Sequence, residues 1–266
     1  MVKWLQKVSM ASLLVLLAGM VGIAGADTLQ EIVKRGELRV AVQTQGPPFS
    51  FVDKKGERTG SSVEFCRLIA KEMGVEIKFL DFDWDGLIPA LLSKKADILA
   101  ADMTPKLSRA LKVSFTNPFY TTGQVMYVKG DSAIASKEDA NKPEITVATL
   151  LGSTYTETAK RVLPQAQIKE YKGGGNIAMN AVVAGHADAG ICDESSYYAM
   201  ASNYPAGALK MYPEKLSYDP LSFAVRPEDR HLLEWLNLFF DWIRNDGRYD
   251  ENINYWVKSL DWKKDH

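Results

Sequence analysis

The sequence predicts an α/β protein made of two lobes, and three observations support this fold class. Short apolar segments alternate with helix-like segments along most of the 266 residues, which is typical of parallel sheets covered by helices. The alternation runs once before about residue 120 and again after it, so two α/β lobes are expected. Hydrophobic residues make up 46% of the chain, an ordinary share for a protein with a buried core.

The first 26 residues predict a secretory signal peptide that is removed from the mature chain. Lys3 and Lys7 form a basic start, the segment Ala11–Ile23 is apolar, and Ala24-Gly25-Ala26 fits a cleavage site. A membrane anchor is the alternative. Glycines and a serine dilute the apolar segment, however, and a spanning helix needs about 20 strongly apolar residues. We therefore expect an exported protein.

Strands and helices of the first half follow from local patterns. Ser61 and Glu64 predict a capping box at the start of a helix that Gly74 ends. Further strands and one more helix are indicated by short apolar runs and by helical spacing, with strands at 38–43, 75–80 and 96–100 and the helix at 87–92.

The second half repeats this order. Strands are expected at 145–149, 168–171 and 187–192, with a turn at Gly152 leading into a helix and another helix at 176–183. The segment 230–244 is strongly helical, with an apolar stripe and Gly247 as its stop. It is too short to form a domain, so we expect it to pack back on a lobe.

Charge and cysteine content argue against several classes of function. Loss of Lys3 and Lys7 takes the formal net charge from −1 to −3, whereas nucleic-acid binding requires a basic surface. Cys66 and Cys192 match no metal-ligand spacing, and the three histidines form no cluster, so no metal and no cofactor is predicted. We expect the two cysteines to stay unbridged, because they fall in different lobes that must move.

Residues suited to binding follow three of the predicted strands, where open α/β sheets bind their ligands. One strand leads into Asp102-Met103-Thr104 with Arg109 downstream, the second into Leu150 to Thr154, and the third into Cys192-Asp193-Glu194. An arginine fork matches a carboxylate, and an aspartate can hold an ammonium group. Together these ends predict a clamp for a zwitterionic α-amino acid. Taken singly, Arg109 could be a solvated charge, and Ser153 and Asp193 could be helix caps.

Five motifs occur in a fixed order along the chain. They are Pro48-Phe49, the segment 84–89 (WDGLIP), Met103-Thr104 with Arg109 before 115–120 (FTNPFY), Gly152-Ser153-Thr154, and the strand from Asp188-Ala189 to Asp193. In these motifs the chain resembles the periplasmic amino-acid-binding proteins of ABC importers, solute-binding protein family 3. The resemblance covers nearly the whole mature chain.

The resemblance implies the type II periplasmic-binding-protein fold, with two lobes joined by a two-stranded hinge. After the signal peptide at 1–26, lobe 1 would comprise 27–121 and 224–266, and lobe 2 would comprise 122–223. Such a protein is a periplasmic monomer, not an enzyme. It closes on one L-amino acid and delivers it to the membrane subunits of an ABC importer.

Roles for single residues follow from the same resemblance. The ligand carboxylate would be held by Arg109, Thr104, Ser153 and Thr154. The ligand amine would be held by Asp193, by the carbonyl of Asp102 and by Thr104. The ligand side chain would contact Trp84, Gln43, Tyr155, Phe49 and Leu150.

Two positions bear on the choice of ligand. Family members that bind basic amino acids commonly have a carboxylate where Gln43 stands and an aromatic residue where Gly46 stands. We therefore expect a neutral polar or aromatic ligand rather than lysine or arginine, although Asp102 could restore an acid to the pocket.

Two other functions fit parts of the sequence. Gly173 to Ala178 fits the G-x-G-x-x-A pattern of dinucleotide binding, but an exported protein rarely meets nicotinamide cofactors. Cyclohexadienyl and arogenate dehydratases share the expected fold, and Glu194 or Asp102 could act as their general acid if burial raised its pKa. The clamp motif shows no second arginine for a second carboxylate, so we expect a binding protein.

Overall fold

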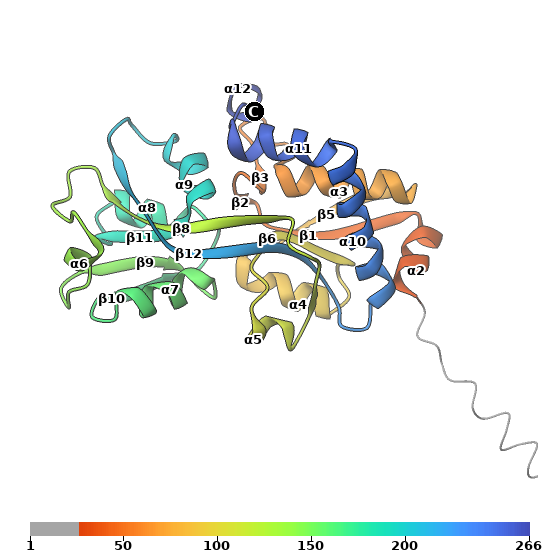
Figure 1. Cartoon of the computed structure of the whole chain (residues 1–266), viewed down its shortest axis with the longest axis horizontal. Helices are drawn as coiled ribbons and strands as arrows, with labels where there is room; N and C mark the ends of the chain where they lie inside the picture. Colours follow the sequence, from red (N-terminus) through yellow and green to blue (C-terminus); the bar gives the residue numbers. More distant parts are fainter. Residues whose placement is uncertain (1–26) are drawn as a thin grey trace, which may run out of the picture.

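Two groups of elements lie at opposite ends of the molecule and are joined by two long strands (Figure 1). The computed structural model describes residues 27–266. Lobe 1 contains α2 to α5, β1 to β7 and the C-terminal helices α10 to α12, and lobe 2 contains α6 to α9 with β9 to β11. The predicted two-lobed α/β fold class is confirmed.

Lobe 1 is built on a parallel arrangement of β1 (Glu37–Val42) between β5 (Glu76–Asp81) and β6 (Ile98–Met103). Its helices before the hinge are α2 (Thr28–Arg35), α3 (Ser61–Met73), α4 (Leu87–Leu92) and the short α5 (Leu107–Ala110), with a 3-10 turn at Trp84–Gly86. A separate antiparallel sheet holds β2 (Gln45–Gly46), β3 (Ser50–Val52) and β4 (Arg58–Thr59).

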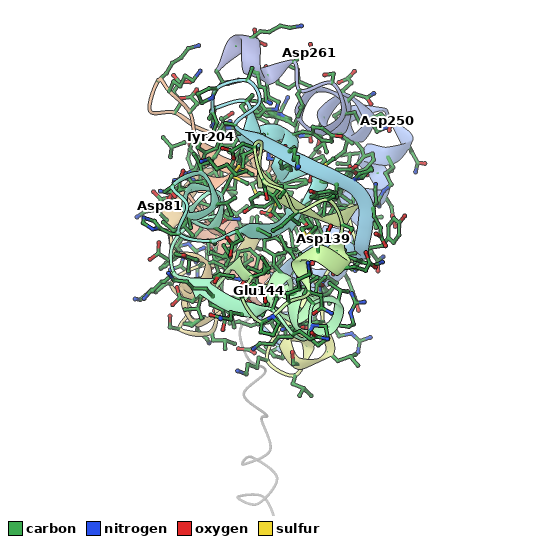
Figure 2. All side chains as sticks on the ribbon, turned by 90° about the vertical axis from the view of Figure 1, so that its left-hand side faces the viewer. Asp81, Asp139, Glu144, Tyr204, Asp250 and Asp261 are labelled. Carbon is green, nitrogen blue, oxygen red and sulfur yellow. The ribbon has the colours of Figure 1, made fainter. Side chains whose placement is uncertain are left out.

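Lobe 2 repeats the parallel pattern. Strand β9 (Thr146–Leu150) pairs with β10 (Gln167–Tyr171) and with β11 (Ala189–Asp193). The helices of this lobe are α6 (Lys137–Ala140), α7 (Thr154–Val162), α8 (Ile177–Val183) and α9 (Glu194–Ala201). Figure 2 views this lobe end-on, with Asp139 and Glu144 labelled at its surface.

The connection between the lobes is an antiparallel pair, β8 (Tyr120–Lys129) and β12 (Leu209–Val225). Strand β8 also pairs with β11, and β12 also pairs with β6 and with β7 (Ser114–Phe115). One sheet therefore continues from lobe 2 into lobe 1, in the order β10-β9-β11-β8-β12-β6-β1-β5. Within each lobe the strands before and after the helices pair in parallel, as the alternation predicts, whereas the two connecting strands run antiparallel to their neighbours. The residue boundaries of the lobes stay a prediction.

The C-terminal segment packs on lobe 1, as expected. Helix α10 (Arg230–Asn245) buries Leu236, Phe239 and Phe240 in the lobe 1 core, where Phe240 meets Phe65 in an edge contact with ring centroids 5.5 Å apart. The chain then continues through α11 (Arg248–Ile253), a π-helical turn at Asn254–Lys258 and α12 (Trp262–Asp265).

The predicted capping box at the start of α3 is wrong. Ser61 is the first helical residue rather than the cap, and its hydroxyl donates to Oδ1 of Asn252 on α11 at 2.5 Å. Glu64 pairs with Arg67 instead of turning back to the cap. The serine therefore ties the start of α3 to the C-terminal segment.

Both cysteines are free and buried, Cys66 on α3 of lobe 1 and Cys192 on β11 of lobe 2, so the structure places them in different lobes, as expected. Within residues 27–266, no helix is long and apolar enough to cross a membrane. The predicted signal peptide lies outside the described residues.

Candidate functional site

The ends of β6, β9 and β11 meet at one cavity between the lobes. Asp102, Leu150 and Asp193, the residues at or next to these strand ends, all line it. The lining residues come from both lobes and are Gln43, Gly46, Pro47, Trp84, Asp102, Thr104, Leu150, Ser153, Thr154, Tyr155, Gly175, Cys192, Asp193, Ser196 and Met200. The cavity measures about 20 Å³ in this closed arrangement, room for about one water molecule. An amino acid therefore needs the lobes further apart than in this arrangement, both to enter and to be held.

Asp193 ends β11 and is buried in the cavity wall, with 3% of its surface exposed. It occupies the N-cap position of α9 without capping the helix, and it accepts a hydrogen bond from the Tyr155 hydroxyl at 3.0 Å instead. Burial, together with the charge of Asp219, raises the pKa of Asp193 to about 7. The carboxylate is therefore poorly solvated and suited to pairing with an ammonium group.

Asp102 is a second buried acid in the same cavity. Its Oδ1 accepts a hydrogen bond from Nε2 of Gln43 at 3.1 Å. Its backbone lies in the left-handed region with φ of 48°, a conformation that aspartate and asparagine tolerate better than most residues and that often marks functional sites. Burial and the nearby charge of Asp193 hold the pKa of Asp102 well above its usual range.

Arg109 lies beside the cavity rather than in its lining. It is 6% exposed, donates from Nη1 to the Thr104 carbonyl and from Nη2 to the Gly152 carbonyl, each at 2.9 Å, and so bridges the lobes. Its guanidinium carbon sits 5.5 Å from the ring centroid of Trp84. A guanidinium has five N–H donors, so donors remain for a carboxylate.

The start of α7 forms another part of the wall. Ser153 takes the N-cap position, but its hydroxyl donates to the Leu150 carbonyl at 2.6 Å instead of capping the helix. The hydroxyl of Thr154 accepts from Nε2 of Gln124 at 2.9 Å. The first N–H groups of a helix lack partners within it and carry a partial positive charge, which suits this end of α7 to an anionic group.

Two residues weighed for the site lie elsewhere. Phe49 is fully buried in the lobe 1 core, with its ring centroid 6.0 Å from that of Phe119, and does not line the cavity. Its predicted contact with the ligand is therefore wrong, because the aromatic ring completes the core. Glu194 pairs with Lys215 at 2.7 Å and does not line the cavity either.

The glycine run after β10 makes a close contact between the lobes. The N–H of Gly175 donates to the Gln45 carbonyl at 2.9 Å. A Cβ at Gly174 would overlap the Cβ of Gln45, and one at Gly175 would lie 2.9 Å from the Gln45 carbonyl oxygen. These glycines let lobe 2 approach the backbone of lobe 1, which accounts for a pattern that also fits dinucleotide binding.

Several lining residues were not singled out from the sequence. Of these, Ser196 and Met200 lie on α9. Their spacing from Asp193, three and seven residues, places all three on one side of the chain as it enters the helix. That spacing was the available signal. Pro47 and Gly175 also line the cavity, and so does Cys192 at the end of the third strand.

Comparisons with known proteins identify similar chains. The family model described as bacterial extracellular solute-binding proteins, family 3, matches residues 38–259. A probable amino-acid ABC transporter-binding protein of Haemophilus influenzae is 27% identical over 237 residues, which cover 87% of this chain and 90% of that protein.

Two solved structures are similar over most of the chain. The ancestral amino-acid-binding protein AncCDT-1, described as a precursor of cyclohexadienyl dehydratase, is 40% identical with a TM-score of 0.81, covering 87% of this chain and 100% of that one. A binding component of an ABC transporter from Wolinella succinogenes, complexed with lysine, is 37% identical with a TM-score of 0.80, covering 86% and 99%.

Proposed function

The chain belongs to the bacterial extracellular solute-binding proteins of family 3, and from this premise we propose that it captures one L-amino acid and delivers it to the membrane subunits of an ABC importer. The observation that carries the proposal is the placement of opposite charges around one cavity, Asp193 in its wall and Arg109 beside it. Arg109 on lobe 1 would hold the ligand carboxylate and Asp193 on lobe 2 its ammonium group. Such a ligand bridges the lobes and favours their closure.

Thr104, Ser153 and Thr154 line the cavity and would add hydrogen bonds to the carboxylate. The carbonyl of Asp102 and the hydroxyl of Thr104 would assist Asp193 at the amine. We propose that the protein acts in the periplasm as a monomer after loss of residues 1–26. Light scattering on the mature protein and sequencing of its N-terminus test these two points.

The test of the binding role is Arg109→Ala. Thermal-shift screening of the wild-type protein against all amino acids should identify a ligand, since binding at about 100 times Kd stabilises a protein by about 2.7 kcal/mol. Calorimetry with that ligand should show the variant losing binding, because removing one partner of a buried charge pair costs about 2–5 kcal/mol. Circular dichroism checks that the variant is folded. Unchanged affinity would contradict the assignment.

The side chain of the ligand has two candidates. Gln43 and Gly46 favour a neutral polar or aromatic side chain in contact with Trp84, Tyr155 and Leu150. A Cβ at Gly46 would overlap the Gln43 amide, so Gln43 takes the place of an aromatic wall. A neutral ligand requires Asp102 to be protonated, which its raised pKa favours. A cationic side chain is the second candidate, since the similar Wolinella protein holds lysine.

A dehydratase on the same fold is the enzymatic alternative. The raised pKa of Asp102 is the feature that favours a general acid. Against it, two buried acids in the cavity would repel a second carboxylate on the substrate. We propose that the protein turns over neither prephenate nor arogenate. Incubation of the purified protein with each compound tests this, and measurable turnover would replace the binding role by a catalytic one.

A further inference from the structure

Asp102 is an acid that the clamp for the α-amino and α-carboxylate groups does not need. We propose that Asp102 and Gln43 form a second cation site in the cavity, which selects an amino acid with a positively charged side chain, a guanidinium or an ammonium. This inference rests on the proposed function, because it assumes that an amino acid binds here.

The placement of Asp102 is the first observation. Its side chain is 7% exposed, lines the cavity, and has a single hydrogen bond, to Gln43. The ligand amine would pair with Asp193, which also accepts a hydrogen bond from Tyr155. Asp102 is therefore not needed for the amine. A buried carboxylate with one neutral donor is poorly compensated. A cation from the ligand would supply the missing partner.

Gln43 is the second and independent observation. The residue is 3% exposed and lines the cavity, yet its Oε1 has no hydrogen-bond partner. A buried acceptor without a donor loses its hydrogen bonds to water and gains none in return. A guanidinium or ammonium group carries several donors, so one ligand cation can satisfy both Asp102 and the Gln43 oxygen.

The balance of charge leads to the same conclusion. No lysine or arginine is among the residues that line the cavity in the described part of the chain, and Arg109 beside it would be used by the ligand carboxylate. The ligand ammonium would balance Asp193. Asp102 then carries an unbalanced negative charge unless the ligand brings a second cation or the acid stays protonated.

This inference reverses the preference expected from Gln43 and Gly46 alone. The acid is present in the cavity, but it is on β6 at position 102 rather than on β1 at position 43. Asp102 and Asp193 are the two buried acids of the cavity, and the charge of Asp193 acts on Asp102. The other titratable groups near them are Tyr155 from α7 and Asp219 from β12. None of them is a cation, so a positive charge that pairs with Asp102 would come from the ligand.

Calorimetry of four ligands on three proteins tests the inference. L-Arginine, L-lysine, L-glutamine and L-phenylalanine are titrated into the wild type, Asp102→Asn and Glu194→Gln. Asparagine is the matched replacement, because it keeps the shape and tolerates the left-handed backbone. Glu194→Gln removes an acid that lies outside the cavity.

The wild type should bind arginine or lysine at least about 30-fold more tightly than glutamine. Asp102→Asn should remove that advantage, and Glu194→Gln should retain it. Asp102→Gly also removes the acid, and glycine adopts the left-handed backbone at this position without strain. In the folded variant it should lose the preference for arginine or lysine, as Asp102→Asn does. A neutral ligand that binds most tightly to the wild type, or an unchanged ratio in Asp102→Asn, would overturn the inference. Failure of every amino acid to bind would instead refute the proposed function.

Proton release gives an independent readout. Titrations in buffers of different ionisation enthalpy report the protons released on binding. A cationic ligand pairs with ionised Asp102, whereas burial raises the pKa of this acid in the ligand-free protein. The wild type should therefore release more protons on binding than Asp102→Asn does. Equal release from the two proteins would mean that Asp102 does not meet the cation.

Discussion

Asp193 shows at the scale of one residue how a binding site can lower the stability of its own fold. Its carboxylate is buried with one hydrogen bond, from Tyr155, and this burial raises its pKa to about 7. An aspartate in an unfolded chain titrates near 3.9. The folded protein therefore binds this proton more tightly than the unfolded chain does, and the stability so gained is complete below about pH 4 and is lost as the pH rises through about 7.

The corresponding prediction concerns Asp193→Asn, whose amide does not titrate. In the absence of ligand, its stability relative to wild type should increase between pH 4 and pH 8, by roughly 4 kcal/mol at most, since one pKa unit corresponds to about 1.4 kcal/mol. Urea unfolding at the two pH values measures the change. A relative stability that does not change with pH would mean that the pKa of Asp193 is the same in the folded protein and in the unfolded chain.

The variant should at the same time lose the ligand. An amide cannot balance the ligand ammonium, so stability gained at pH 8 and affinity lost are expected together. A variant that bound as tightly as wild type would show that the ammonium group has another partner.

At the scale of elements, the loop between β10 and α8 decides how closely the lobes can approach. Gly174 and Gly175 face Gln45 of β2, a residue of the other lobe, and leave no space for a side chain. The hydrogen bond from the Gly175 N–H to the Gln45 carbonyl exists only when the lobes are together. Closure is therefore limited by backbone contact here, away from the charged groups of the clamp.

Gly174→Ala should weaken ligand binding by favouring the open form, with little effect on folding, because its clash is with the other lobe. Calorimetry measures the affinity, and small-angle X-ray scattering measures whether ligand still reduces the radius of gyration. Gly86→Ala is a suitable control, since Gly86 has φ of −86° and its Cβ would lie 3.7 Å from Phe82. Adding Gln45→Gly to Gly174→Ala should restore binding. If the double variant stays weak, the contact does not control closure.

For the whole molecule, relative motion of the lobes is a requirement, because the closed cavity is too small to admit an amino acid. The two strands β8 and β12 are continuous through the connection, and each lobe has a buried cluster of its own. These features allow the lobes to turn about the strands without unfolding. The separation of Cys66 and Cys192 between the lobes agrees with this, since a bridge would hold the lobes together.

The thiols provide a test of this arrangement. Burial raises the pKa of both thiols above the usual range, so the native protein should react slowly with a thiol reagent at pH 8. After unfolding in denaturant without reductant, both cysteines should react. Only one or no reactive thiol in the unfolded, exported protein would contradict the unbridged state.

Elements with a clear local pattern were predictable from the sequence. The helix at 87–92 and the strands near 38–43 and 168–171 follow from apolar spacing, which depends on neighbouring residues alone. Most residues of the cavity wall were predictable for a related reason, since residues directly after a strand must lie at the edge of the sheet where ligands bind.

Other features depend on contacts between distant segments, and only the tertiary structure decided them. Ser61 finds Asn252, 191 residues away, instead of capping its own helix. Phe49 completes a core, although the family resemblance implied a ligand contact for it. The inward position of Asp102 and the contact of Gly174 with Gln45 likewise arise only when the lobes meet. Sequence alone determined which residues stand at the strand ends. Packing determined which of them face the cavity, because the direction of a side chain depends on the distant segments that pack around it.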